Sequence, residues 1–304
     1  MYFAYEQLSA LAAVIRQGSF DGAARVLHVT PSAVSQRIKQ LEEHLGAIVV
    51  VRGKRCAPTE LGAAVYRHAQ QVELLEKDLL GTLAPEPGEA APQTPVAMAA
   101  NADSLATWLV PALARVVAET GARVDVAVDD EDNTAEWLRS GRVLGAVTSE
   151  ARAVQGCRVH ALGAMRYRAT ASRSFIDRCL AAGVTLAALR RAPVLAFDRN
   201  DVLAGHFLRQ RFGKRAADPP LVHFLPSPQA IVEATLLGQG WSVNPERLVD
   251  ELIARKKLVD LFPGRFLDVT LFWQQWALRS PSLEVLATIL SEEAARSLHR
   301  GRRG

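Results

Sequence analysis

The stretch Val29–Gly46, VTPSAVSQRIKQLEEHLG, constrains the fold of this 304-residue chain more than any other segment. At about 100° per residue its apolar side chains share one helix face, and these are Val34, Ile38, Leu41 and Leu45. Thr30 stands where an N-cap is expected, and Pro31 follows at the first helical position, where its missing N–H does no harm. A surface helix with an ordinary polar face would look the same, so the neighbouring segments must decide its purpose.

The segments on both sides complete a recognisable unit. A first helix is predicted from apolar residues at helical spacing that end at Gly18, and Ser19 can cap a second helix that begins near Asp21. The tight turn HVT then leads into the third helix, which is the helix-turn-helix pattern. After Gly46, AIVVV and RGKRCAPT indicate a strand, a basic turn and a return strand. Residues 1–58 are therefore predicted to be an all-α winged helix-turn-helix domain.

The charges of this unit favour a polyanionic partner. The whole chain has a formal charge of +4, and residues 31–58 hold five bases against only Glu42 and Glu43, a net charge of +3. Gln36 can pair with adenine in the major groove, whereas Arg37 lies on the flank of the helix and suits a phosphate. Double-stranded DNA is the expected partner. The candidate DNA contacts are Pro31, Ser32, Ser35, Gln36, Arg37, Lys39, Arg52, Lys54 and Arg55.

A long helix is predicted over residues 59–83, before a linker rich in proline and acidic residues at 84–95. Its stripe has nearly a 3.5-residue repeat and comprises Leu61, Val65, His68, Val72, Leu75, Leu79 and Leu83. This spacing favours a dimerising coiled coil, although a helix that packs on its own domain would look similar.

From residue 96 to residue 300, strand patterns alternate with helix patterns. Strands are expected near 96–101, 123–130, 143–149, 194–198 and 223–227, and helices at 104–120, 133–141 and 281–300. This rhythm predicts a mostly parallel α/β sheet with ligand-binding loops at the carboxyl ends of its strands.

The remaining features narrow the class of protein. Apolar residues make up 49% and charged residues 22%, and no run approaches a membrane span. The N-terminus lacks the basic region of a signal peptide, so we expect a cytoplasmic protein. The sequence has no P-loop, HExxH or GxSxG motif and no zinc-type cysteine spacing, so no enzyme activity, cofactor or metal is expected. Cys157 and Cys179 are either buried inert thiols or a redox pair.

Four motifs carry a resemblance to a known family. FDGAARVLHVTPSAVSQRIKQLEEHLG, together with VVR and PTELG, resembles the LysR family of bacterial transcriptional regulators. NADSLATWLVPALA, VDDEDNTAEWLRSGRVLGAVTS and APVLAFDRND look like its lysine/arginine-responsive branch, the ArgP/LysG type, also described as inhibitors of chromosome replication initiation. The likeness runs from about residue 4 to about residue 295.

The resemblance implies an effector domain with two Rossmann-like halves, similar to periplasmic binding proteins, after the winged domain and linker helix. Half I would hold about 96–161 and 269–300, and half II about 162–268. It also implies homo-oligomers, dimers through the linker helix and usually tetramers, on interrupted inverted repeats. Lysine and arginine would be the effectors, a basic amino acid exporter gene the target, and RNA polymerase a candidate partner.

The effector would lie between the two halves. Ser104 matches a family contact position and could hold a ligand carboxylate at a helix N-terminus, but Asp103 or Ser104 could instead simply cap that helix. A ligand cation needs a carboxylate partner, for which Asp130 and Glu131 are further candidates beside the acids of the main set. The main set of predicted effector contacts is Asp103, Ser104, Asp129, Thr148, Ser149, Asp198, Asp201 and Ser242.

Two departures from the family pattern bear on the ligand. Gly145 stands where many members have Asp, which fits the lysine/arginine branch. The segment GQGWSVNP, expected to be a pocket-lining loop, has Asn244 in place of an apolar residue and the bulky Trp241 nearby, so a LysR-type regulator with a different effector is the alternative. A solute-binding protein would explain only the α/β part and would need a signal peptide.

Overall fold

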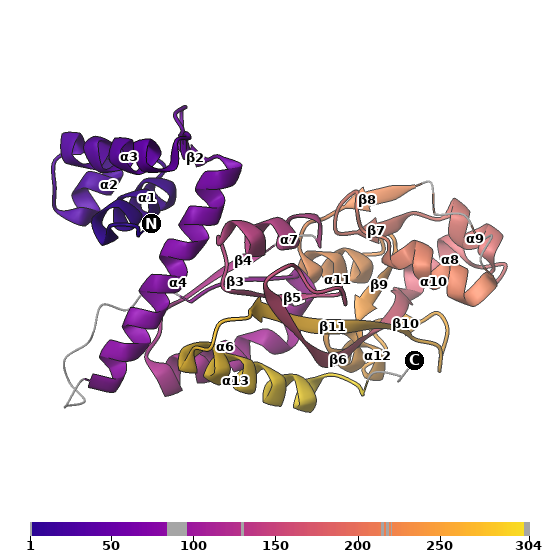
Figure 1. The fold of residues 1–304 in the computed structure, drawn as a ribbon. Helices are drawn as coiled ribbons and strands as arrows, with labels where there is room; N and C mark the ends of the chain where they lie inside the picture. Colours follow the sequence, from indigo (N-terminus) through magenta and orange to yellow (C-terminus); the bar gives the residue numbers. More distant parts are fainter. Residues whose placement is uncertain are drawn as a thin grey trace.

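The computed structural model describes residues 2–83, 96–128, 131–213, 216, 219 and 221–300. The chain begins with a small helical module, continues through one long helix and ends in an α/β domain (Figure 1). This arrangement confirms the predicted fold class.

The N-terminal module consists of α1 (Tyr5–Gln17), α2 (Phe20–Leu27), α3 (Pro31–Leu45), β1 (Val50–Val51) and β2 (Ala57–Pro58). Its helices start where the sequence provides caps: the Ser19 hydroxyl accepts from Gly22 N at 3.0 Å, and the Thr30 hydroxyl accepts from Ala33 N at 3.2 Å. The tight turn after α2 uses His28 in the left-handed conformation, with φ of 55°. The strands β1 and β2 pair antiparallel as the predicted wing.

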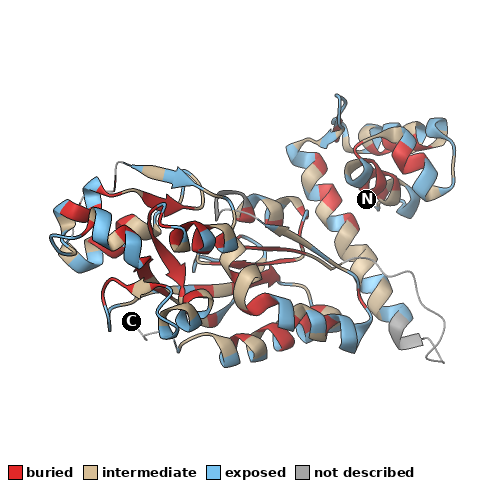
Figure 2. Ribbon diagram, turned by 180° about the vertical axis from the view of Figure 1, so that it is seen from behind, coloured by how far each residue is buried: buried red, intermediate tan, exposed pale blue. Residues whose placement is uncertain are grey.

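The helix α4 (Glu60–Leu83) has two kinds of surface. Val65, Tyr66 and Ala69 are buried in the core of the N-terminal module, whereas Leu75 and Leu79 are exposed. The first turns therefore pack on the chain's own domain and the later turns keep exposed leucines (Figure 2), while dimerisation through this helix stays a prediction.

The α/β domain is built on one continuous sheet with the strand order β4-β3-β5-β11-β6-β9-β7-β8, and β10 pairs with β6. Its strands are β3 (Val96–Ala100), β4 (Val124–Val128), β5 (Gly145–Thr148), β6 (Cys157–Ala171), β7 (Val194–Ala196), β8 (Val222–Phe224), β9 (Trp241–Pro245), β10 (Val259–Asp260) and β11 (Leu267–Trp276). The sheet is mixed, which corrects the expectation of a mostly parallel one: pairing is parallel inside each half, but β6 and β11 run antiparallel to their neighbours.

The helices cover the sheet on both sides, and the core lies between them (Figures 1 and 2). They are α5 (Ala102–Ser104), the π-helical turn η1 (Leu105–Leu109), α6 (Val110–Thr120), α7 (Glu131–Ser140), α8 (Arg173–Cys179), α9 (Leu186–Arg191), α10 (Leu203–Phe212), α11 (Pro228–Leu236), α12 (Glu246–Ala254) and α13 (Pro281–Ser297). Among the described residues, none of the helices has both the length and the apolar character that a bilayer crossing requires.

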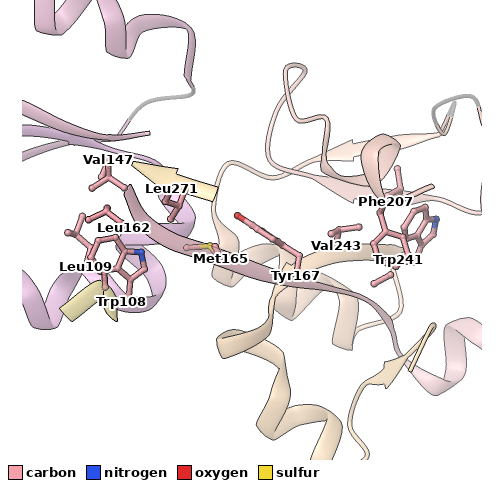
Figure 3. Close-up of a cluster of buried hydrophobic side chains, with 14 of the residues drawn as sticks. Trp108, Leu109, Val147, Leu162, Met165, Tyr167, Phe207, Trp241, Val243 and Leu271 are labelled. Carbon is pink, nitrogen blue, oxygen red and sulfur yellow. The ribbon is translucent and has the colours of Figure 1, made fainter. Parts of the chain in front are cut away.

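The two long strands β6 and β11 join the halves of the domain. β11 pairs with β5 on the β3-β4-β5 side, β6 pairs with β9 on the β7-β8-β9 side, and the two long strands pair with each other, with a register shift between Leu271 and Phe272. Buried side chains follow this pair of strands from Trp108 and Leu109 at one end to Phe207 and Trp241 at the other (Figure 3). The halves therefore share a single apolar core across the crossover.

Candidate functional site

The α3 helix divides its faces as the sequence predicted. Val34, Ile38 and Leu41 are buried in the module. The predicted contact residues Pro31, Ser32, Gln36 and Lys39 are exposed, and Ser35 and Arg37 are half-buried on its flanks. The Ser32 and Thr30 hydroxyls lie 2.9 Å apart, so the helix start presents a hydroxyl pair beside its N–H groups. This surface has the short polar groups that let a helix backbone approach a nucleic-acid groove.

The basic residues of the wing are exposed, but their side chains pack against different neighbours. The Arg52 guanidinium stacks 4.6 Å from the centre of the Phe20 ring, which fixes it beside the start of α2. Lys54 projects from the turn between the strands. The Arg55 side chain instead lies against Gly18, where any added Cβ would sit 2.6 Å from Arg55 Cγ. Arg55 therefore packs against the turn between α1 and α2.

Glu42 has a function that the sequence did not reveal. Its Oε1 accepts from the Val49 N–H at 2.9 Å and so connects the end of α3 to the start of the wing. Glu43, by contrast, forms an exposed ion pair with Lys39 at 3.6 Å.

The helix that begins at Ala102 resolves the question about Ser104. Asn101 is the N-cap, since its Oδ1 accepts from Ser104 N at 2.8 Å, so neither Asp103 nor Ser104 has that role. The hydroxyl of Ser104 is buried and has no hydrogen-bond partner among the described residues, and the same holds for Trp108 Nε1 one turn later. The intervening turn is π-helical, a local widening often found at functional sites. Two buried polar groups without partners indicate a place for a bound polar molecule.

Asp103 connects the two halves through hydrogen bonding and charge. The Tyr167 hydroxyl on β6 donates to Asp103 Oδ2 at 2.8 Å, and Figure 3 shows that hydroxyl turned towards the Trp108 side. Burial raises the pKa of Asp103 from 3.8 to about 6; the Tyr167 hydrogen bond opposes this rise, and the nearby charge of Asp201 adds to it. Carboxylates from opposite halves therefore repel each other at neutral pH and would attract a cation.

The other predicted effector residues lie at strand ends. Asp198 and Asp201 follow β7: Asp198 Oδ1 accepts from Asn200 N at 2.7 Å, and Asp201 accepts from the N–H groups of Phe197 and Leu203, each at 2.9 Å. Thr148 ends β5, and its hydroxyl accepts from Glu150 N at 3.1 Å. Ser149 is half-buried next to it. Asp129 and Asp130 lie outside the described residues, and the structure does not describe the Glu131 side chain.

Ser242 and its neighbours require a correction. GQGWSVNP is not a loop, because its last five residues form the buried strand β9. Ser242 contacts the Thr235 hydroxyl at 2.7 Å and accepts from Asn244 Nδ2 at 2.6 Å. Asn244 also donates to Thr170, and Trp241 donates to the Leu189 carbonyl. These polar groups satisfy one another inside half II, so the structure favours a structural role for Ser242.

Comparison with known proteins identifies the family. The model for "Bacterial regulatory helix-turn-helix protein, lysR family" matches residues 5–63, and the model for "LysR substrate binding domain" matches residues 89–295. The chain belongs to the LysR family. LysG of Mycobacterium tuberculosis, a transcriptional regulator, is 43% identical to it over 299 residues, which are 97% of this chain and 94% of that protein.

Two solved structures of LysR regulators resemble this one along nearly the whole chain. The crystal structure of ArgP from Mycobacterium tuberculosis matches with a TM-score of 0.85 at 42% identity, and covers 97% of this chain and 98% of that one. Full-length LysG from Corynebacterium glutamicum, with bound effector arginine, matches with a TM-score of 0.77 at 34% identity over 97% and 99% of the two chains. The protein is thus a DNA-binding transcription regulator of the LysG/ArgP type and not an enzyme.

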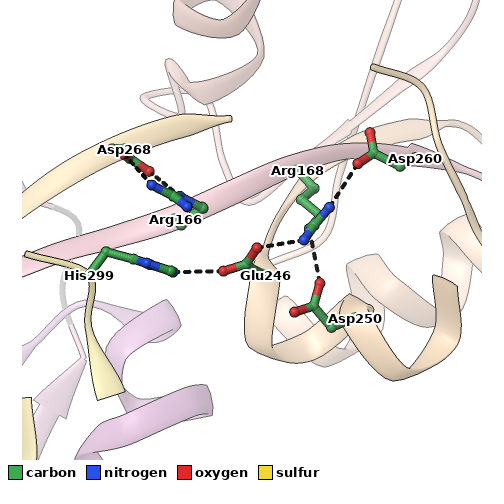
Figure 4. Close-up of polar contacts among 7 residues, drawn as sticks. All are labelled: Arg166, Arg168, Glu246, Asp250, Asp260, Asp268 and His299. Atoms are coloured by element: carbon green, nitrogen blue, oxygen red, sulfur yellow. Dashed lines mark hydrogen bonds and ion pairs between the residues drawn. The ribbon is translucent and has the colours of Figure 1, made fainter. Parts of the chain in front are cut away.

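The sequence did not predict an ion-pair network that surrounds Arg168 in this LysR protein (Figure 4). Arg168 on β6 binds Glu246 at 2.7 Å, Asp250 at 2.9 Å and Asp260 at 3.0 Å. His299, beyond α13, lies 2.7 Å from the other oxygen of Glu246. The network therefore connects the end of the chain, which packs on half I, to α12 in half II.

The same segment is attached to β6 where the strand crosses between the halves. Ala164 N donates to His299 O at 2.8 Å, and His299 N donates to Ala164 O at 2.9 Å. Gly163 allows this approach, since a Cβ there would lie 2.9 Å from His299 O. Ion pairs and backbone hydrogen bonds together hold the crossover between the halves.

Proposed function

We propose that this regulator binds arginine or lysine at the junction of its two halves and that this binding changes how it binds DNA. The observation that carries the proposal is the buried carboxylate of Asp103 in half I, which the Tyr167 hydroxyl of half II contacts and the charge of Asp201 influences, next to the partnerless Ser104 hydroxyl. The arginine bound to the related LysG of Corynebacterium glutamicum supports the choice of ligand.

The chemistry of the junction suits both ends of a basic amino acid. The Ser104 hydroxyl and the N–H groups at the helix start, which lack partners inside the helix, suit the α-carboxylate. Asp103 and Asp201 suit the side-chain cation, because a positive charge removes their mutual repulsion. Thr148 and Ser149 at the end of β5 and Asp198 after β7 are proposed as further contacts.

The DNA-binding half of the proposal rests on α3 and the wing. Short polar residues at the start of α3 would read base edges in the major groove, while Arg37 and Arg52 would bind phosphates. The exposed leucines of α4 would form a dimer with a second copy, and dimers would assemble into the tetramers that bind interrupted inverted repeats. A cytoplasmic location, contact with RNA polymerase and control of a basic amino acid exporter gene complete the proposal.

Calorimetric titration with matched ligands tests the effector. Arginine and lysine should release or absorb heat on binding, whereas citrulline, which has the length of arginine but no cation, should bind at least tenfold more weakly because it cannot pair with the carboxylates. Asp103→Asn should lose this preference for the cation. Asp177→Asn, which changes an exposed acid of α8 in the same way, should keep it.

Two outcomes would contradict the proposal. Equal affinity for arginine and citrulline would show that the carboxylates do not contact the ligand's side chain. No heat with either basic amino acid, but heat with another amino acid in a panel, would establish a LysR-type regulator with a different effector.

A further inference from the structure

A cavity of about 740 Å³ lies between the N-terminal module and the α/β domain. One wall comes from α1, the wing and α4, and the other from β3, β4, α6, the segment after α7 and the start of α13. Figure 1 shows α4 passing between these two parts of the molecule. The volume falls within the range of small-molecule sites, and the place is separate from the Asp103–Asp201 junction.

The walls of this cavity combine apolar surface with positive charge. Leucine, isoleucine and valine side chains from both sides provide most of the apolar part, among them Ile15, Leu74, Val116, Leu144, Leu283 and Leu286. Four basic residues line it against the acids Glu73 and Asp125. Glu73 is already bound to Arg16, one of the four bases. An excess of cations in a partly apolar enclosure favours an anion with an apolar body.

Two of these cations are available and well fixed. Arg55 enters from the wing and lies against Gly18, and Arg142 enters from the α/β domain and stacks 4.2 Å from the Trp137 ring centre. Neither guanidinium forms an ion pair with a carboxylate of the described segments. Because they come from opposite walls, a single anion could bind both.

Two further contacts join the two walls, one polar and one a close packing of backbones. Asp78 of α4 accepts from the Ser280 hydroxyl at 2.6 Å and also binds Ser282 at the start of α13. Gly141 approaches the backbone of α4 so closely that a Cβ would lie 2.9 Å from Arg67 Cα. A molecule held in the cavity would therefore add a second set of contacts and fix the DNA-binding module relative to the effector domain.

We propose that this cavity is a second ligand site, which takes a small anion with an aromatic or aliphatic body, held between Arg55 and Arg142. The ligand couples the orientation of the winged module to the α/β domain. The site acts independently of the basic effector, since the two sites share none of these residues and prefer opposite charges.

The test uses the full-length protein and the fluorescent anion 8-anilinonaphthalene-1-sulfonate. One probe molecule should bind per chain, and Arg142→Ala and Arg55→Ala should each weaken it about tenfold by removing a charge-assisted contact. Arg139→Ala is the matched control, because Arg139 lies three residues away, is exposed and does not line the cavity. Indole-3-acetate should displace the probe, whereas the cation tryptamine should not.

Filling the cavity gives an independent check. Leu74→Trp should abolish probe binding while arginine binding persists, with circular dichroism to show that the variant is folded. Probe affinity unchanged in both arginine variants would overturn the proposal and would place the probe elsewhere, for example on the exposed leucines of α4. Equal displacement by indole-3-acetate and tryptamine would overturn the assigned charge preference.

Discussion

Acidification should weaken arginine binding because it protonates the carboxyl group of Asp103. The pKa of Asp103 is raised to about 6, chiefly by burial, and arginine needs the ionised form. A carboxyl of this pKa is roughly nine-tenths ionised at pH 7 and roughly one-tenth ionised at pH 5. The Kd for arginine should therefore rise about tenfold from pH 7 to pH 5 and change little between pH 7 and pH 8.

Calorimetric titration at pH 5, 6, 7 and 8 measures this dependence. The guanidinium and α-carboxylate of arginine do not change charge over that interval, so the protein supplies the titrating group. For Asp103→Asn the Kd for arginine should be higher than that of the wild type at pH 7 and nearly constant down to pH 5. The reasoning is refuted if wild-type affinity does not depend on pH, or if the asparagine variant keeps the wild-type profile.

Three further results are expected. Asp103→Asn should raise the free energy of unfolding of the ligand-free protein at pH 7 by about 1–3 kcal/mol after a discount for partial exposure, and with it the melting temperature. The protonated Asp103 carboxyl is compatible with burial below pH 3.8, and this stability is lost as the pH rises through the folded-state pKa of about 6. The difference in melting temperature between the asparagine variant and the wild type should therefore vanish near pH 4. Gln36→Ala should relax the sequence preference and cost roughly 1–3 kcal/mol of operator-binding free energy. Arg52→Ala should instead weaken binding to DNA of any sequence and flatten its salt dependence. Equal losses of affinity for operator and scrambled DNA in both variants would contradict this. Leu75→Glu with Leu79→Glu should shift sedimentation towards monomer, while Val285→Glu, an exposed site on α13, should not.

The N-terminal module could be predicted from sequence because its signals are local. Ser19 and Thr30 cap the helices whose first turns they precede, and Gly18 and Gly46 end α1 and α3 in the left-handed conformation. Each feature involves residues within a few positions of one another. The polar face of α3 follows from the same short-range periodicity.

The crossover strands could not be predicted in this way. β6 contains Gly163 in its middle and pairs with β11, which lies about a hundred residues later, so its stability comes from partners that no local pattern reveals. Arg168 binds acids 78, 82 and 92 residues away for the same reason. Long-range pairing also turned the expected loop at Trp241 into a buried strand.

At the effector junction the sequence predicted the residues better than their roles. Asp103, Ser104 and Asp201 stay predicted effector contacts, but the cap of the helix is Asn101, and the Ser104 hydroxyl has no hydrogen-bond partner among the described residues. The hydrogen bond from Tyr167 to Asp103 arises only because β6 crosses beneath the helix start. Ser242 shows the opposite case, in which a polar residue is used entirely inside one half.

A crystal structure of the protein with arginine tests most directly whether the junction of the two halves is the effector site. We expect the guanidinium between the carboxylates of Asp103 and Asp201, and the α-carboxylate within hydrogen-bond distance of the Ser104 hydroxyl. Arginine bound elsewhere, or bound at the junction with its guanidinium away from both carboxylates, would contradict it.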